Sequence, residues 1–205
     1  MVFSFNVIFI FRLVLQTTDR NIRGQGCRQI HWFHKMSRRV VITGTGLITA
    51  LGIGKKQNIS GIIEGRDAIK EITSFDVKSY RGKTGGEVNG FNFSKKLKRL
   101  KPSRLDRATK FLLAAVDEAL LEAGLREGLP QDASFILGTT LGGMFSGEIY
   151  HKSIVYGKKG RPSLILDYLA HSQGAHLTEE YGLNGKPFTI SNACASGTNA
   201  IGFAY

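Results

Sequence analysis

The chain has 205 residues, 42% of them hydrophobic, and a formal net charge of +12. A chain of this length can bury one sizeable core, and its apolar fraction excludes a disordered tail. No apolar run reaches the roughly 20 residues of a membrane-spanning helix, so we expect a globular protein without a membrane span. The two cysteines, Cys27 and Cys194, do not support a disulfide framework. No spacing typical of metal ligands is present, so we expect neither a metal nor another cofactor.

The basic charge is concentrated in the first half of the chain, because residues 111–205 carry more acidic than basic side chains. Its densest part is the run KKLKRLK at 95–101, which is followed by Arg104 and Arg107. The run lacks the interleaved aromatic residues that stack on bases, so a nucleic-acid partner is not expected. It forms either a solvated face or a docking surface for an acidic protein.

Residues 1–35 differ from the rest, since an apolar stretch from Val2 to Leu15 is followed by an arginine-rich one. A secretory signal is disfavoured because Arg12 interrupts the apolar stretch. The simplest interpretation is that translation begins at Met36, which leaves an extension of doubtful status at 1–35 and a domain at 36–205. A cytoplasmic location follows, with the mitochondrion or plastid as the alternative if residues 1–35 are a transit peptide.

The first elements of the domain are short. The β-branched run Val40–Ile42 predicts a buried strand that ends in a glycine turn at 43–46. A dinucleotide site is disfavoured there, because Thr49 stands where the third glycine belongs. Residues 55–65 predict a helix, and residues 66–93 predict loops with short edge strands.

The strongest helix signal follows Pro102. Ser103 is the expected N-cap, Asp106 lies three residues further, and Gly124 is the expected stop. Apolar side chains recur at helical spacing and predict one buried face, formed by Ala108, Leu112, Ala115, Val116, Ala119, Leu120 and Ala123.

The second half repeats the alternation of strand and helix. Strands are predicted at 134–137 and 187–191, and a mostly helical stretch is predicted at about 162–181. A further helix begins after Asn192. This order predicts an α/β fold with a mixed, mostly parallel sheet covered by helices.

The strongest candidate for chemistry is Cys194, at the corner where the last strand turns into a helix. The free backbone amides at the start of a helix favour a thiolate, and the neighbouring residues are small enough to let an acyl group approach the sulfur. A small buried cysteine under the helix is the alternative. Ser196 is a weaker nucleophile candidate, since Cys194 replaces the first glycine of a G-x-S-x-G motif.

Six segments in this order resemble the N-terminal half of the beta-ketoacyl-[acyl carrier protein] synthase family, the elongating condensing enzymes of fatty-acid synthesis. The resemblance covers residues 36–205. The segments are VVITGTGLITALG at 40–52, Phe75-Asp76, DRATKFLLAAVDEALLEAGL at 106–125, LGTTLGGM at 137–144, the stretch 176–185 and TISNACASGTNAIG at 189–202.

The resemblance implies a thiolase-like fold, an acyltransferase activity and a homodimer at full length. Cys194 would take an acyl group from acyl carrier protein, and its backbone amide would form half of the oxyanion hole. Malonyl-carrier protein would then lose carbon dioxide and attack that acyl group, giving a 3-oxoacyl product. Leu141 and Met144 match positions that line the acyl pocket. Positions that present positive charge to the carrier protein are matched by Arg104, Arg107, Lys159 and Arg161.

The family takes two catalytic histidines, a lysine and a glycine-rich loop from its second half, and no counterpart is present in these 205 residues. The chain is therefore expected to be a truncated half that cannot condense alone. The local histidines His151, His171 and His176 are expected to have packing or surface roles. Alternatives are a polyketide-type ketosynthase, a coenzyme A-dependent thiolase-like enzyme, and a basic binding module without chemistry.

Overall fold

The computed structural model describes residues 6–13, 40–125 and 127–205. The strands are β1 (Asn6–Leu13), β2 (Val40–Thr49), β3 (Gly52–Ile53), β4 (Ile69–Glu71), β5 (Thr84–Gly86), β6 (Ile136–Gly138) and β7 (Phe188–Ile190). The helices are α1 (Lys55–Ile63), α2 (Arg107–Glu122), α3 (Met144–Val155), α4 (Ser163–Tyr168), α5 (Ser172–Tyr181) and α6 (Ser196–Ala204), with 3-10 turns η1 (Pro102–Arg104) and η2 (Ala193–Ala195). In this described part, no helix has both the length and the apolar character that crossing a membrane requires.

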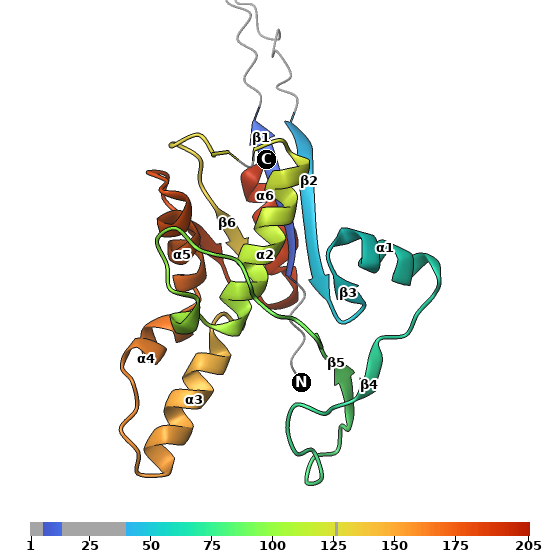
Figure 1. Ribbon diagram of the computed structural model, residues 1–205, viewed down its shortest axis with the longest axis vertical. Helices are drawn as coiled ribbons and strands as arrows, with labels where there is room; N and C mark the ends of the chain where they lie inside the picture. The colour runs from blue at the N-terminus through green and yellow to red at the C-terminus, as the bar shows by residue number, and fades with distance from the viewer. Residues whose placement is uncertain (1–5, 14–39, 126) are drawn as a thin grey trace, which may run out of the picture.

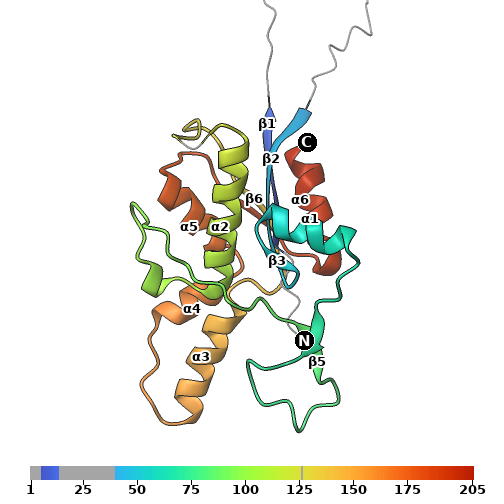
Figure 2. The ribbon, with the colours of Figure 1, turned by 45° about the vertical axis from the view of Figure 1, so that its right-hand side comes forward.

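The central strands lie between two helical layers (Figures 1 and 2). Helices α2 and α5 are on one side of β1 and β2, and α6 is on the other. Hydrogen bonds join the strands into three small sheets: β1-β2-β3 and β4-β5 are antiparallel, and β6-β7 is parallel. The predicted α/β class is confirmed, but the predicted mostly parallel sheet is wrong. Among the described strands only β6 and β7 pair in parallel, because β2 pairs antiparallel with β1 and β3, and β4 pairs antiparallel with β5. Strand β1 falls within residues 1–35, which the sequence analysis left outside the domain, and it pairs along β2 from Val40 to Ile48.

Strand β2 packs directly on α2 through its glycines. A Cβ on Gly44 would lie 2.0 Å from the Ala119 carbonyl oxygen, and one on Gly46 would lie 1.9 Å from that of Ala115. The predicted turn at 43–46 is therefore wrong, because β2 continues through both glycines. They are required by the close approach of the helix backbone and not by a reversal of the chain.

Helix α2 is the centre of the hydrophobic core, as its spacing predicted. Its N-cap is Asp106, whose side chain accepts from the Ala108 N–H at 2.8 Å, so the prediction of Ser103 is wrong. The reason is that Pro102 and Ser103 belong to the separate turn η1. Gly124 ends the helix region with φ of 69°, as expected. The main buried cluster consists of Leu105, Leu112, Leu113, Val116, Leu120, Leu137 and Leu177.

Helices α3 and α4 form a protruding hairpin at the lower end of the molecule (Figure 1). Helix α3 was not predicted from the sequence, because it buries only Ser146 and contains a glycine in its second turn. The hairpin closes tightly at its base, since a Cβ on Gly143 would lie 1.8 Å from the Asp167 carbonyl oxygen. Position 143 therefore requires glycine even though its φ is negative.

The basic run at 95–101 is anchored to the core. The buried carboxylate of Glu180 accepts backbone N–H bonds from Lys98 at 2.7 Å and from Arg99 and Leu100, both at 3.1 Å. Leu97 and Leu100 pack against the main buried cluster. The run therefore has an anchored backbone, while the side chains of Lys96, Lys98, Arg99 and Lys101 are exposed, as either a solvated face or a docking surface requires.

Lys95 fastens the start of the run to α2 and α5. Its ammonium pairs with Asp117 and lies 5.3 Å from the centre of the Tyr181 ring. The Tyr181 hydroxyl donates to Asp117 at 2.8 Å. Burial, and then the neighbouring Asp117 carboxylate, raise the pKa of Tyr181 well above its ordinary value, so the phenol stays protonated as a donor.

Candidate functional site

The site is built where β7 turns into α6. Strands β6 and β7 run in parallel, and the chain leaves β7 through Asn192 into η2, which leads directly into α6. Cys194 lies in η2 and is exposed. The predicted strand-to-helix corner is confirmed, whereas the alternative of a buried structural cysteine is wrong. Its catalytic role stays a prediction.

Small residues make this corner possible. A Cβ on Gly138, at the end of β6, would lie 2.3 Å from the carbonyl oxygen of Ser196, the first residue of α6. Ala193, directly before the cysteine, has φ of 55°, the left-handed region that L residues rarely adopt. The turn is therefore a constrained backbone geometry that places Cys194 at the surface.

A hydroxyl network holds this turn. Ser196 is 3% exposed, and its Oγ accepts from the Asn192 N–H at 2.9 Å and donates to the Ala193 carbonyl at 2.7 Å. Thr140 Oγ1 donates to the same carbonyl at 3.0 Å. Ser196 is therefore committed to holding the backbone, which disfavours it as a nucleophile. Sequence reasoning missed Thr140; the signal for Ser196 was its position at the start of a helix, where hydroxyl side chains bond nearby amides.

The predicted pocket residues lie in the loop that reaches the turn and in the helix after it. Leu141 directly follows Thr140, and Met144 begins α3. Their exposed fractions are 36% and 47%, so neither side chain is enclosed. A cavity of about 340 Å³ lies against α5, and none of the predicted site residues lines it. Its lining includes Arg99, Thr178, Glu179, Gly182, Asn184 and Pro187.

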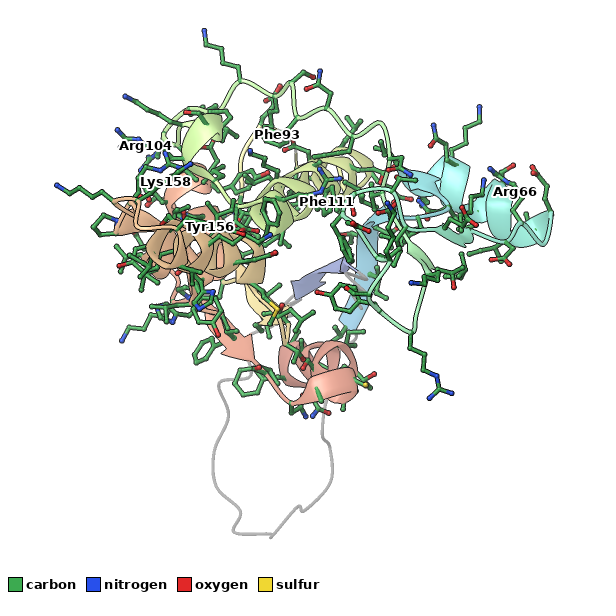
Figure 3. The ribbon with its side chains drawn as sticks, turned by 90° about the horizontal axis from the view of Figure 1, so that it is seen from below. Arg66, Phe93, Arg104, Phe111, Tyr156 and Lys158 are labelled. Atoms are coloured by element: carbon green, nitrogen blue, oxygen red, sulfur yellow. The ribbon has the colours of Figure 1, made fainter. Side chains whose placement is uncertain are left out.

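The four predicted docking residues are exposed, and they lie in two separate segments of the chain. Arg104 and Arg107 lie in η1 and at the start of α2, and Lys159 and Arg161 lie in the loop between α3 and α4. Seen from below, Arg104 and Lys158 are on the same side of the molecule, opposite Arg66 (Figure 3).

Arg107 is partly committed to the fold. Its guanidinium donates to the Val88 carbonyl at 2.7 Å and lies 4.9 Å from the centre of the Phe111 ring. Of Arg104 in η1 and Arg107 in α2, Arg104 therefore has the greater freedom to meet a partner.

No hydrogen bond joins Cys194 to any of the three histidines that the structure describes. His176 Nε2 is 2.9 Å from the carboxylate of the buried Asp167, a contact between α5 and α4. His171 precedes α5 and His151 is exposed on α3. The packing or surface roles expected for these residues agree with this arrangement.

An exposed cysteine at the start of a helix, after a parallel strand pair, defines a candidate acyl-transfer site. Residues 37–205 match the family model described as "Beta-ketoacyl synthase, N-terminal domain". The chain belongs to the beta-ketoacyl synthase family, and its fold is the N-terminal part of a thiolase-like fold.

Two curated relatives carry the same name, 3-oxoacyl-[acyl-carrier-protein] synthase 2. The Synechocystis sp. (strain ATCC 27184 / PCC 6803 / Kazusa) protein is 31% identical over 172 residues, which cover 82% of this chain and 41% of that protein. The Staphylococcus aureus (strain COL) protein is 29% identical over 173 residues, which cover 82% of this chain and 42% of that protein. The chain thus spans less than half the length of these relatives.

A solved structure described as the ishigamide ketosynthase/chain length factor is also similar. It is 25% identical, with a TM-score of 0.70, over 78% of this chain and 41% of that chain. The sequence resemblance to the family is therefore confirmed at the level of family and fold.

Proposed function

We propose that this chain supplies the nucleophile of a 3-oxoacyl-[acyl carrier protein] synthase. The observation that carries the proposal is the exposed thiol of Cys194 at the constrained turn from β7 into α6. Free amides at a helix start favour a thiolate and can stabilise an oxyanion. The names of the two curated relatives support the same reaction class.

In the first half-reaction, the Cys194 thiolate attacks the carbonyl carbon of an acyl thioester on the carrier protein. A sulfur–carbon bond forms, the carbonyl oxygen becomes an oxyanion, and the Cys194 amide donates to it. The intermediate collapses when the carrier-protein thiolate leaves, and the acyl group remains on Cys194. The condensation with malonyl-carrier protein belongs to a protein that also contains the second half of the family fold.

The acidic carrier protein would dock through Arg104 and Arg107, with Lys159 and Arg161 along the same side of the molecule. Arg104 and Lys158 project on this side in Figure 3. Charge complementarity of this kind raises the association rate more than the final affinity. Arg104→Glu should therefore slow acyl transfer from carrier protein but not from octanoyl-coenzyme A. Arg66→Glu is the control, because Arg66 lies on the opposite side.

The acyl chain would run along Leu141 and Met144. Support comes from Thr140, which precedes Leu141 and bonds the residue before Cys194. A second copy of the chain would enclose this space, since the α3–α4 hairpin exposes apolar side chains that a dimer interface would bury. They include Met144, Phe145, Ile149, Ile154, Val155 and Leu166.

We take residues 36–205 as the domain and residues 1–35 as an extension, which the family match from residue 37 supports. The proposed location is the cytoplasm; import of a fluorescent fusion into mitochondria or plastids would instead identify residues 1–35 as a transit peptide.

The test is acyl transfer from octanoyl-carrier protein, measured as carrier-protein thiol released and octanoyl group retained on the chain. We expect slow transfer to the wild-type chain, none to Cys194→Ala, and no 3-oxoacyl product after malonyl-carrier protein is added. Equal transfer to Cys194→Ala would contradict the proposal. Formation of 3-oxoacyl product would contradict the restriction to the first half-reaction.

A further inference from the structure

Two hydroxyl groups from different segments converge on one carbonyl at the turn. Thr140 Oγ1 and Ser196 Oγ donate to the Ala193 carbonyl oxygen at 3.0 Å and 2.7 Å, and the Ser196 backbone N–H donates there as well. Each hydroxyl has one proton, so both protons are committed to this carbonyl. The 3.3 Å contact between the two hydroxyl oxygens therefore adds little.

This carbonyl belongs to the peptide group that carries the Cys194 N–H. A trans peptide is planar, with its C=O and N–H directed oppositely, so fixing the carbonyl also fixes the direction of the N–H. Hydrogen bonds accepted by the carbonyl polarise the peptide and strengthen its N–H as a donor. Thr140 and Ser196 thus act on the Cys194 amide through the Ala193 carbonyl, without contacting the acyl group that the sulfur would attack.

The backbone needs such support. Ala193 has φ of 55°, and left-handed backbone at a residue with a Cβ persists only where the surroundings enforce it. Ser196 holds the other end of the turn as well, because its buried Oγ accepts from the Asn192 N–H at 2.9 Å. Strand β6, from whose end Thr140 extends, and helix α6 are therefore linked at one peptide group.

We propose that Thr140 and Ser196 are positioning residues that orient and polarise the Cys194 amide toward the oxyanion formed during acyl transfer. The inference rests on the proposed function, since only attack on a thioester produces that oxyanion.

The test compares two reactions of the same sulfur. In alkylation by iodoacetamide, the thiolate forms a sulfur–carbon bond while iodide leaves, and no oxyanion arises. In acylation by octanoyl-coenzyme A, the thiolate attacks the carbonyl, an oxyanion forms, and the coenzyme A thiolate leaves. A positioning role of the Cys194 amide should therefore affect acylation and spare alkylation.

Thr140→Val removes one hydroxyl at nearly constant volume, and Thr140→Ser is the matched control that keeps it. We expect Thr140→Val to slow acylation about tenfold, less than the ~10²–10³-fold cost of deleting an oxyanion-hole donor outright. Alkylation should change by less than about twofold, and Thr140→Ser should behave as wild type in both reactions. Ser196→Ala is the secondary variant, because it leaves the Asn192 N–H without its acceptor and can fail to fold.

Equal acylation of wild type and Thr140→Val would overturn the inference, and so would a parallel loss of alkylation, which indicates general damage to the turn. If the wild-type chain is alkylated but never acylated, the proposed function fails separately. The structural part of the inference, that the Thr140 hydroxyl polarises the Cys194 amide, is then decided by the amide ¹⁵N chemical shift of Cys194 in protein labelled at cysteine. A difference between Thr140→Val and Thr140→Ser supports it, and identical shifts overturn it.

Discussion

Positions 44 and 46 of β2 accept only glycine, because the backbone of α2 occupies the space that a Cβ would fill. Gly46→Ala would place the new carbon 1.9 Å from the Ala115 carbonyl oxygen, which forces strand and helix apart. We expect a loss of about 3 kcal/mol in the free energy of unfolding, measured by urea denaturation. The control is Gly202→Ala in α6, where no atom lies within 4 Å, and it should change stability by less than about 1 kcal/mol. An equal effect of both substitutions would contradict the packing account.

Glu180 stabilises the basic run through three backbone N–H groups, from Lys98, Arg99 and Leu100. Glu180→Ala leaves these donors without their acceptor and should cost about 3 kcal/mol of unfolding free energy. The neighbouring exposed Glu179 provides the control, with an expected change within about 0.5 kcal/mol. Thermal and urea unfolding of both variants measure the difference, and similar stability would show that Glu180 is dispensable.

At this scale, the sequence predicted Cys194 and its corner because the small residues and the change from strand to helix lie close together in the chain. It could not predict the partners of Glu180, which are about 80 residues away. The same holds for Thr140 and Ala193, which are 53 residues apart. Contacts of this kind depend on how the elements pack, and local patterns do not encode that packing.

At the scale of elements, two glutamates one turn apart on α2 connect the helix to β2 and α1. Glu118 accepts from the backbone N–H of Leu47 and Lys55, and Glu122 accepts from Thr45 and pairs with the Lys55 ammonium. The Lys55 hydrogen bond first, and then those from Thr45, lower the pKa of Glu122 from 4.5 to about 2.

A lowered pKa in the folded state stabilises the fold above the unfolded value of 4.5, and this contribution is lost as pH falls toward about 2. Glu122→Gln should therefore be less stable than wild type at pH 7, and the gap should narrow from pH 4.5 to pH 2. Urea denaturation across this range measures it, with Glu71→Gln on the exposed strand β4 as the control. A gap that stays constant with pH would contradict the assignment.

Helix α2 was predictable because its own residues supply the apolar face, whereas α3 was not. Helix α3 buries only Ser146 and exposes Met144, Phe145 and Ile149, so its sequence lacks an amphipathic pattern. The pairing of β1 with β2 was likewise unpredictable, since strand partners follow from topology and not from the local alternation of residues.

At the scale of the whole molecule, β1 and the domain proposed at 36–205 can be separated by experiment. A chain that begins at Met36 lacks β1, so β2 loses its antiparallel pairing from Val40 to Ile48 and the melting temperature should fall by several degrees. Alkylation of Cys194 should stay within about twofold of wild type, because β6, β7 and α6 form the turn. If the chain that begins at Met36 neither folds nor reacts at Cys194, residues 1–35 belong to the domain.

The central claim is that the turn from β7 into α6 makes Cys194 the acyl acceptor. Its most direct test is mass spectrometry of the chain after incubation with octanoyl-carrier protein, followed by peptide mapping of the adduct. The account predicts one octanoyl group per chain, bound as a thioester on the peptide that contains Cys194 and absent from Cys194→Ala. An adduct on Cys27, or no adduct on a folded chain whose Cys194 still reacts with iodoacetamide, would contradict it.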